Sequence, residues 1–443
     1  MRYVKKLSQK GISKKELLDV MQAARVNDAS WKEGRTFSLV YYAGEELSNV
    51  AKEAYNSFFH ENGLNPMAFQ SLRKFETEVV SMTSDLLHGN ELVVGSLTSG
   101  GSESILMAVK AYRDFARKMK PHIKEPEMLI PMTAHAAFEK AAHYFGVKAI
   151  HIPVNDRYEV DVEKMREAIT PNTILLVGSA PNYPQGVMDP IEALGELAIK
   201  TGLPLHVDAC LGGFIIPFVE KLGYDIRPFD FRVQGVTSIS ADVHKYGYAA
   251  KGVSVLLYRD EELRRTQYFA YTEWPGGLFV SPSMTGTRPG GAIAAAWAIM
   301  NYLGLEGYLK LAEKTMQTTE KILKGIALIP ELTILGEPQA SIFSLASEDV
   351  NILIVADQME GKGWYMDRQQ FPTSLHFMIT PAHENIADQF IEDLRVAVKF
   401  AKNNPLAAKE GAAAMYGMVG QIQDKTQVHE YILQTLDQTM RLK

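Results

Sequence analysis

A lysine follows a β-type run near the middle of the chain. The run Val236–Ala241 consists of small and β-branched residues, and Asp242-Val243-His244-Lys245 comes directly after it. Because burial penalises an ammonium group, a lysine at the end of a buried strand is costly unless it has a task. Burial also lowers the pKa of the amine and makes it nucleophilic towards carbonyls. We therefore predict that Lys245 binds pyridoxal 5′-phosphate (PLP) as a Schiff base; an exposed loop lysine is the alternative.

A Gly-Ser stretch, Thr98-Ser-Gly-Gly-Ser-Glu-Ser104, separates a short apolar run from a helical pattern. Two glycines let the backbone approach an anion, and a helix N-terminus offers free N–H groups with a favourable dipole. The stretch has neither the Walker nor the Rossmann spacing. It is a candidate phosphate site, and an ordinary glycine turn with a serine cap explains it equally well.

An aspartate ends another expected strand, in His206-Val-Asp208-Ala-Cys210. Alternation directs the three polar side chains to one side, and Asp208 is suited to hold the protonated ring nitrogen through which PLP acts as an electron sink. A buried aspartate satisfied by backbone donors is one alternative. A metal site is another; its ligands would be His206, Asp208, Cys210, Asp242 and His244.

Three further segments carry polar groups into the same region. His135 opens a helix and is suited to stack on a cofactor ring, or only to cap that helix. Tyr183, in a Pro-rich turn, is a candidate for substrate binding or proton transfer, or simply a loop aromatic. The stretch from Ser281 to Gly291 is rich in Gly, Ser, Thr and Pro, and is either a phosphate-binding loop or a bare connector.

Strand-like and helix-like segments alternate from about residue 65, which predicts an α/β protein with a mainly parallel seven-stranded sheet and helices on both faces. Ligands bind beyond the carboxyl ends of such strands. The expected strands are 91–96, 128–132, 148–154, 173–179, 203–210, 236–241 and 252–258. Polar residues lie at or just after the ends of five of them: Ser99–Ser102, His135, Asn182–Tyr183, Asp208 and His244–Lys245.

The domain organisation is expected to have three parts. Residues 1–55 form an arm with little core of its own, which is expected to pack on a second subunit. Residues 56–305 form the large cofactor-binding domain. Residues 306–443 form a smaller C-terminal α/β domain, which two helices, about 292–303 and 307–328, connect to the large one.

Composition excludes several classes of protein. The 443 residues carry a net charge of −6, which offers no basic surface for nucleic acid or anionic membrane. One cysteine, Cys210, allows no intrachain disulfide and fits a reducing compartment. No apolar run is long enough for a transmembrane segment, and no signal-peptide core follows Met1. We expect a cytoplasmic protein.

Several stretches resemble the sphingosine-1-phosphate lyases, which are fold-type I PLP enzymes related to the group II amino-acid decarboxylases. The resemblance runs from about residue 7 to past 418, and the block from Ser240 to Gly252 is specific to these lyases. The other matching stretches are Trp31–Arg35, Thr98–Asp114, Ala134–Phe138, Pro204–Phe214, Phe229–Arg232, Arg288–Gly291, Phe371–Phe377 and Tyr416–Met418.

The resemblance implies roles for individual residues. Lys245 is the Schiff-base lysine, His135 stacks on the ring and Asp208 pairs with its nitrogen. The cofactor phosphate is held by Gly101, Ser102 and His244, and by Gly286 and Thr287 from the other subunit of a homodimer. Lys251 and Tyr183 match catalytic and substrate-binding positions, and Tyr41 matches a substrate tyrosine contributed across the dimer. A substrate-side histidine of the family is Asn65 here, which donates a hydrogen bond but brings no positive charge.

The implied reaction is retro-aldol cleavage of sphingosine 1-phosphate to a long-chain aldehyde and phosphoethanolamine. A PLP-dependent amino-acid decarboxylase with the same cofactor site is the alternative activity. A non-catalytic dimeric scaffold is a third possibility, although the presence of Lys245, Asp208 and His135 argues against it.

Overall fold

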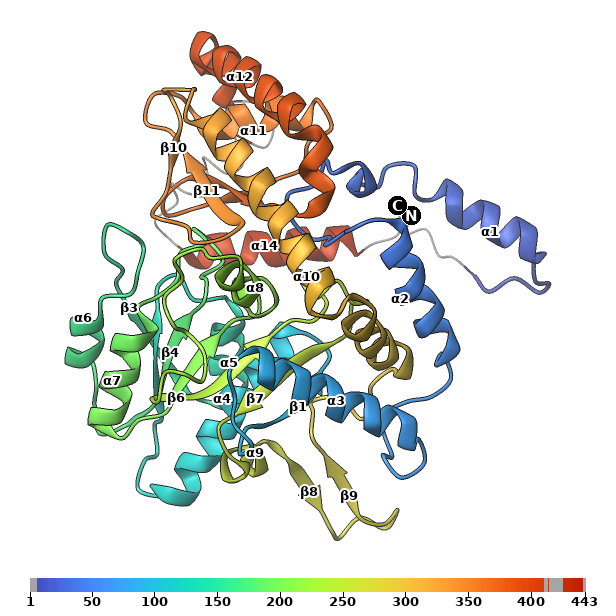
Figure 1. Cartoon of the computed structure of the whole chain (residues 1–443), viewed down its shortest axis with the longest axis vertical. Helices are drawn as coiled ribbons and strands as arrows, with labels where there is room; N and C mark the ends of the chain where they lie inside the picture. The colour runs from blue at the N-terminus through green and yellow to red at the C-terminus, as the bar shows by residue number, and fades with distance from the viewer. Residues whose placement is uncertain (1–5, 410–412, 414–424, 441–443) are drawn as a thin grey trace.

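The computed structural model describes residues 6–409, 413 and 425–440. A seven-stranded sheet forms the centre of the larger part of the molecule (Figure 1). Its strands run in the order β1 (Val94–Thr98), β7 (Ser254–Tyr258), β6 (Val236–Ala241), β5 (Leu205–Asp208), β4 (Thr173–Ser179), β2 (Glu127–Pro131) and β3 (Lys148–Ile152). Only β7 runs antiparallel to its neighbours β1 and β6, so the predicted mainly parallel sheet of seven strands is confirmed.

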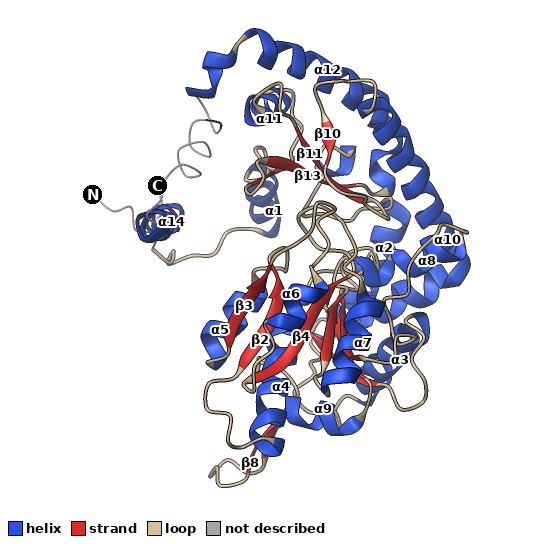
Figure 2. Cartoon of the chain, turned by 90° about the vertical axis from the view of Figure 1, so that its left-hand side faces the viewer, coloured by secondary structure: helices blue, strands red, loops and turns tan. Residues whose placement is uncertain are grey.

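Helices cover both faces of this sheet, because successive apolar residues of each buried strand point to opposite sides (Figure 2). Met128, Leu175 and Val177 pack with α4 (Gly101–Met119) and α5 (Ala137–Phe145). Leu129, Leu176 and Val207 pack on the other side. That side is covered by α3 (Gln70–Leu86), α7 (Ile191–Thr201), α8 (Ile216–Lys221) and α10 (Gly290–Ile326); α6 (Val162–Glu167) and α9 (Glu261–Gln267) complete the larger part.

A second sheet lies in the C-terminal part. Its four antiparallel strands run in the order β10 (Thr333–Ile334), β11 (Ile342–Ala346), β13 (Ser374–Met378) and β12 (Asp367–Gln369). The helices α11 (Ile352–Glu360) and α12 (Ala387–Asn403) pack on it around a separate core that includes Trp364, Phe377 and Phe390. The two connecting helices expected near residue 305 are both present within α10, where they meet at a kink at Gly304 with a φ of 52°.

The N-terminal arm contacts its own chain. Phe37 is fully buried in the C-terminal core, where its ring stacks on His383 with centroids 4.6 Å apart. Thr36 forms a bridge to Tyr365, and α2 (Glu45–Ser57) packs against α10. The helix α1 (Lys14–Ala23) has no buried residue, so its packing on a second subunit stays a prediction.

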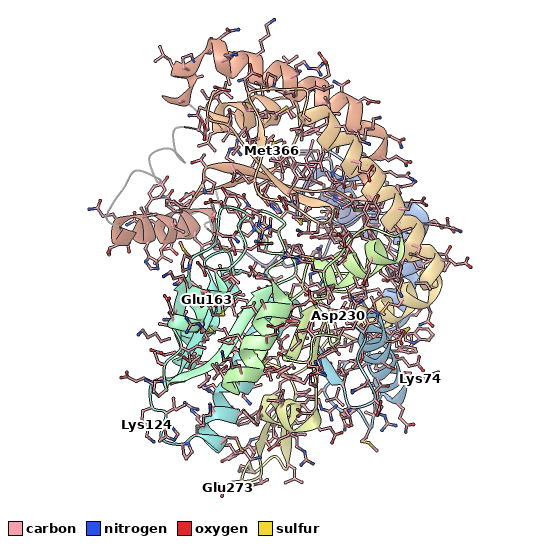
Figure 3. All side chains as sticks on the ribbon, turned by 60° about the vertical axis from the view of Figure 1, so that its left-hand side comes forward. Lys74, Lys124, Glu163, Asp230, Glu273 and Met366 are labelled. Carbon is pink, nitrogen blue, oxygen red and sulfur yellow. The ribbon has the colours of Figure 1, made fainter. Side chains whose placement is uncertain are left out.

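Two exposed elements complete the described chain. The hairpin of β8 (Phe269–Tyr271) and β9 (Phe279–Ser281) projects from the larger part, with Glu273 at its outer end (Figure 3). The helix α14 (Lys425–Thr439) is the last described element of the chain. Among the described helices, none is long and apolar enough to cross a lipid bilayer.

Candidate active site

The carboxyl ends of the central strands surround a cavity of about 450 Å³. The polar residues expected at five strand ends contribute to its wall, except Asn182, whose amide is buried against the Tyr158 carbonyl. The chain segments that supply the wall are widely separated in sequence. The predicted site residues that line the cavity are Gly101, Ser102, His135, Tyr183, Asp208, His244, Lys245 and Lys251.

The Lys245 amine faces a buried carboxylate. Its Nζ lies 3.0 Å from Oδ2 of Asp242, whose Oδ1 accepts a hydrogen bond of 2.5 Å from the Ser254 hydroxyl. Burial is the largest single effect and lowers the pKa of Lys245, but the charge of Asp242, its hydrogen bond and smaller contributions from neighbouring groups together outweigh burial, so the net pKa is raised. The expected lowering of this pKa is therefore wrong. From the sequence, Asp242 is a candidate only as a metal ligand.

Lys245 is also connected to the C-terminal sheet through the next residue. The hydroxyl of Tyr246 is fully buried, donates to the backbone carbonyl of Ile379 at 2.9 Å, and accepts from the Ser341 hydroxyl at 2.9 Å. Both partners belong to the C-terminal part. The turn that presents Lys245 is thus held by Asp242 of the larger part and by two hydrogen bonds to the C-terminal part.

Asp208 lies at the end of β5 with its carboxylate in the cavity wall. Its Oδ1 accepts from the backbone N–H of Cys210 at 3.0 Å and from the Ser240 hydroxyl at 3.2 Å. The same hydroxyl lies 3.3 Å from Nε2 of His206, and burial lowers the pKa of that histidine to about 4. The neutral imidazole of His206 therefore contacts the Ser240 hydroxyl, which orients Asp208. The Cys210 N–H is a backbone donor of the kind expected if Asp208 were only a buried structural aspartate.

The N-terminus of α4 opens into the cavity next to Asp208. No side chain caps it, so the first N–H groups of the helix are available to an anion. A Cβ atom on Gly101 would lie 2.6 Å from Oδ2 of Asp242, so only glycine allows this close approach. Glu103 fixes the turn, because its carboxylate accepts the N–H groups of Ser99 and Met284, both at 2.6 Å.

Tyr183 is held by residues of the C-terminal sheet that sequence reasoning missed. Its hydroxyl donates to Oδ2 of Asp367 at 2.7 Å, and its ring stacks on His376 with centroids 4.1 Å apart. His135 presents its ring edge-on to Tyr183 at 6.3 Å, while its Nδ1 accepts the N–H of Ala137 at the start of α5. His135 therefore lines the cavity and caps a helix.

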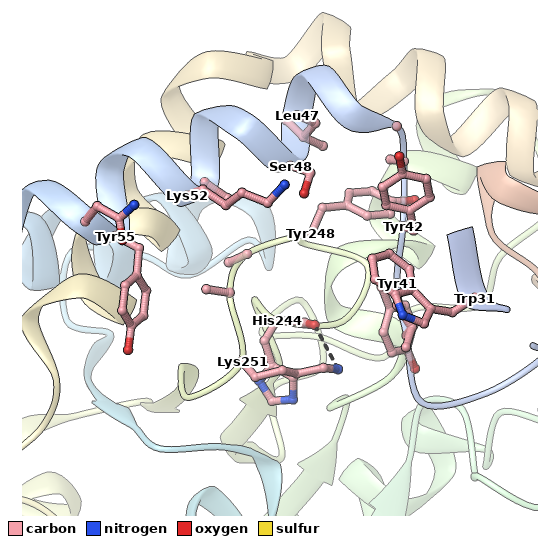
Figure 4. Close-up of a pocket in the computed structure, with 17 residues that line it drawn as sticks. Trp31, Tyr41, Tyr42, Leu47, Ser48, Lys52, Tyr55, His244, Tyr248 and Lys251 are labelled. Carbon is pink, nitrogen blue, oxygen red and sulfur yellow. Dashed lines mark hydrogen bonds between the residues drawn. The ribbon is translucent and has the colours of Figure 1, made fainter. Parts of the chain in front are cut away.

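Lys251 lines both this cavity and a second one of about 360 Å³, whose lining residues are drawn in Figure 4. Its Nζ lies 5.0 Å from the centre of the Tyr41 ring and donates to the His244 carbonyl at 3.4 Å. Although the residue is exposed overall, desolvation of its amine and then the charge of Lys245 lower the pKa of Lys251 to about 8. The second cavity is lined by Tyr41, Leu47, Ala51, Tyr55 and Tyr248, among others.

Three predicted site residues lie outside both cavities within one chain. Asn65 is exposed, and its side-chain oxygen accepts the N–H of Met67 at 2.9 Å. Gly286 and Thr287 are exposed too, and the Thr287 hydroxyl donates to Asn62 at 2.9 Å. The matching stretch 416–418 lies outside the described residues.

Two candidate ligands of the metal alternative, Asp242 and Cys210, have other partners in the structure. Over residues 6–409, 413 and 425–440, no group of three His, Cys, Asp or Glu side chains is arranged to hold a metal ion. The Asp242 carboxylate is instead paired with the Lys245 amine, and Cys210 Sγ donates to the Ser240 hydroxyl at 3.3 Å.

Comparison with known proteins decides the family. Residues 29–344 match the model of the pyridoxal-dependent decarboxylase conserved domain. Sphingosine-1-phosphate lyase 1 of Rattus norvegicus is 46% identical over 431 residues, which are 97% of this chain and 76% of the rat protein. The chain belongs to the sphingosine-1-phosphate lyase family. The family member of Arabidopsis thaliana is 45% identical over 95% of this chain and 79% of its own length.

A solved family structure has the same architecture. The sphingosine-1-phosphate lyase of Burkholderia pseudomallei superposes with a TM-score of 0.91 at 38% identity, covering all of this chain and 98% of that one. The fold is therefore the fold-type I PLP architecture, and the family model makes PLP the cofactor. The cavity fits this cofactor, since it combines an amine, a carboxylate suited to a protonated ring nitrogen, and an uncapped helix N-terminus.

Proposed function

We propose that this enzyme cleaves sphingosine 1-phosphate and related phosphorylated sphingoid bases to a long-chain aldehyde and phosphoethanolamine. The observation that carries the proposal is the junction at Lys251. A cation there adjoins the Lys245 amine on one side and a cavity with apolar and aromatic walls on the other. A substrate with an amine, a phosphate and a long alkyl chain needs these three features together. The names of the family members quoted above support the same reaction.

Different residues of the cavity would hold different parts of the cofactor and of the substrate. Lys245 would hold PLP covalently, and Asp208 would receive the ring N–H. The N-terminus of α4 at Gly101 and Ser102, with His244, would hold the phosphate, and His135 would lie against the ring. When bound, PLP supplies an electron sink for the bond that breaks. Lys251 would bind the substrate phosphate and Tyr183 would handle the proton of the substrate hydroxyl.

The test separates carbon–carbon cleavage from decarboxylation. The PLP-loaded enzyme is incubated with sphingosine 1-phosphate, and fatty aldehyde and phosphoethanolamine are measured by mass spectrometry. Carbon dioxide release from a panel of amino acids is measured in parallel. We expect aldehyde and no carbon dioxide. Carbon dioxide without aldehyde would replace this function with amino-acid decarboxylation.

We further propose a homodimer that acts in the cytoplasm. Gly286 and Thr287 would then contribute to the site of the other subunit, and Asn65 would approach the substrate from the dimer interface. Tyr41, which the resemblance assigned to the other subunit's site, lies beside Lys251 of its own chain. The exposure of Gly286, Thr287 and Asn65 in the single chain supports this arrangement. Sedimentation should give twice the 49.3 kDa mass of the chain; a stable, active monomer would contradict it.

The lowered pKa of Lys251 predicts a pH dependence of substrate binding. Below about pH 8 the amine is protonated and attracts a phosphate dianion; above it the amine is neutral and the attraction is lost. The KM for sphingosine 1-phosphate should therefore rise as the pH passes upward through about 8. Lys251→Arg stays protonated and should remove this rise, measured by steady-state kinetics between pH 6.5 and 9.5. An unchanged pH profile in that variant would assign phosphate binding to another residue.

A further inference from the structure

We propose that Asp367, a residue of the C-terminal sheet, positions Tyr183 in the cavity and acts as its proton acceptor. When Tyr183 accepts the proton of the substrate hydroxyl, its own proton passes to Asp367. The inference rests on the proposed retro-aldol function, because that reaction requires a base for one hydroxyl proton. It assigns the end point of this proton to a side chain outside the cavity wall.

Two neighbouring side chains fix Tyr183 in complementary ways. Asp367 on β12 and His376 on β13 are directly paired in the sheet register. The imidazole of His376 stacks on the Tyr183 ring at an interplanar angle of 24°, which sets the plane of the ring. The Asp367 carboxylate accepts the Tyr183 hydroxyl at 2.7 Å, which sets the direction of its hydrogen.

The direction of that hydrogen determines what Tyr183 can do. Because the hydrogen points to Asp367, the phenol oxygen has only lone pairs to offer to the cavity, where it acts as an acceptor. A substrate hydroxyl next to Lys245 is therefore a donor to Tyr183. Burial and the charge of Asp367 raise the pKa of Tyr183, so the phenol keeps its proton until another arrives.

The proton transfer balances within this pair. The O–H bond of the substrate breaks as a new O–H bond forms at Tyr183, while the original Tyr183 proton passes to Oδ2 of Asp367. The electron pair of the substrate O–H bond becomes the second bond of the aldehyde carbonyl. The pair of the carbon–carbon bond leaves with the amine-bearing fragment. His376 does not compete for the proton, because its imidazole stacks on the face of the Tyr183 ring while the Tyr183 hydroxyl donates to Asp367.

A double-mutant cycle tests this chain of transfer. Asp367→Asn keeps an oxygen that can accept the Tyr183 hydroxyl but cannot take a proton. We expect the single-turnover rate of sphingosine 1-phosphate cleavage to fall about 100-fold, the lower end of what a general base contributes, with little change in KM. In the Tyr183→Phe background the same substitution should have no further effect. Asp388→Asn, which removes an exposed ion pair of 2.7 Å with Lys321, is the matched control and should keep full activity.

Two readouts besides activity separate transfer from a structural role. The Asp367→Asn variant should bind PLP with wild-type affinity, measured by absorbance titration, and should keep the wild-type melting temperature. The inference would be overturned if Asp367→Asn retained half of the wild-type rate or lost PLP binding. It would also be overturned if Asp367→Asn lowered the rate in the Tyr183→Phe background by the same factor as in the wild type. A wild-type enzyme that releases no aldehyde would instead refute the proposed function, so the two failures are distinct.

Discussion

Alanine at position 245 is expected to reduce aldehyde release by about 10³-fold or more and to abolish the visible absorbance of the bound cofactor. Removal of a covalent nucleophile typically has effects of this size or larger. In the wild type the amine lies 3.0 Å from the Asp242 carboxylate at the cavity wall. Borohydride should fix the cofactor on the peptide that spans residues 236–252 in the wild type and leave that peptide unlabelled in Lys245→Ala, as measured by mass spectrometry.

A second shielded lysine provides the control for this substitution. The Nζ of Lys110 donates to the backbone carbonyls of residues 266–268 at 2.8–3.0 Å, so its role is to hold the C-terminal end of α9. Lys110→Ala should lower the melting temperature and keep both cofactor absorbance and turnover per folded molecule. Full turnover by Lys245→Ala would refute the Schiff-base assignment.

Replacing Asp208 with asparagine is expected to lower kcat by about 10²- to 10³-fold, the range seen when one preorganised electrostatic group is removed. An amide cannot balance the charge of a protonated ring nitrogen, so the cofactor becomes a poorer electron sink. The carboxylate already receives the N–H of Cys210 and the Ser240 hydroxyl, which hold it in place for this task. Single-turnover kinetics with saturating PLP measures the effect on the chemical step.

Another buried carboxylate distinguishes this effect from a loss of stability. Asp189 accepts the backbone N–H groups of Val160 and Ser179, both at 2.8 Å, and does not line the cavity. Asp189→Asn should lower the melting temperature while the chemical step stays near the wild-type rate. If Asp208→Asn keeps the wild-type kcat, another group stabilises the ring nitrogen.

The sequence predicted best those elements that are buried on both faces. The strands at Thr173–Ser179 and Val236–Ala241 have the predicted bounds, because a continuous apolar or small-residue run between turn residues has few other stable arrangements. The strand at Asp367–Gln369 was missed because its three residues are polar and carry no strand pattern. Its pairing with β13 depends on tertiary structure.

The candidate site, too, was predictable where it depends on sequence pattern and unpredictable where it depends on tertiary contacts. The strand-end rule brought together the residues of one cavity, because all parallel strands present their carboxyl ends at one edge. It could not indicate that Asp367 would contact Tyr183 from 184 residues away. The pKa of Lys245 was predicted with the wrong sign because the sequence does not reveal how closely Asp242 approaches the amine.

The buried hydroxyl of Tyr246 has a mechanical consequence. It joins the backbone beside Lys245 to Ile379 and Ser341, so the two halves of the molecule cannot swing apart without breaking two shielded hydrogen bonds next to the reactive amine. We therefore expect substrate entry and product exit to depend on small local displacements, because a hinged opening would have to break both hydrogen bonds.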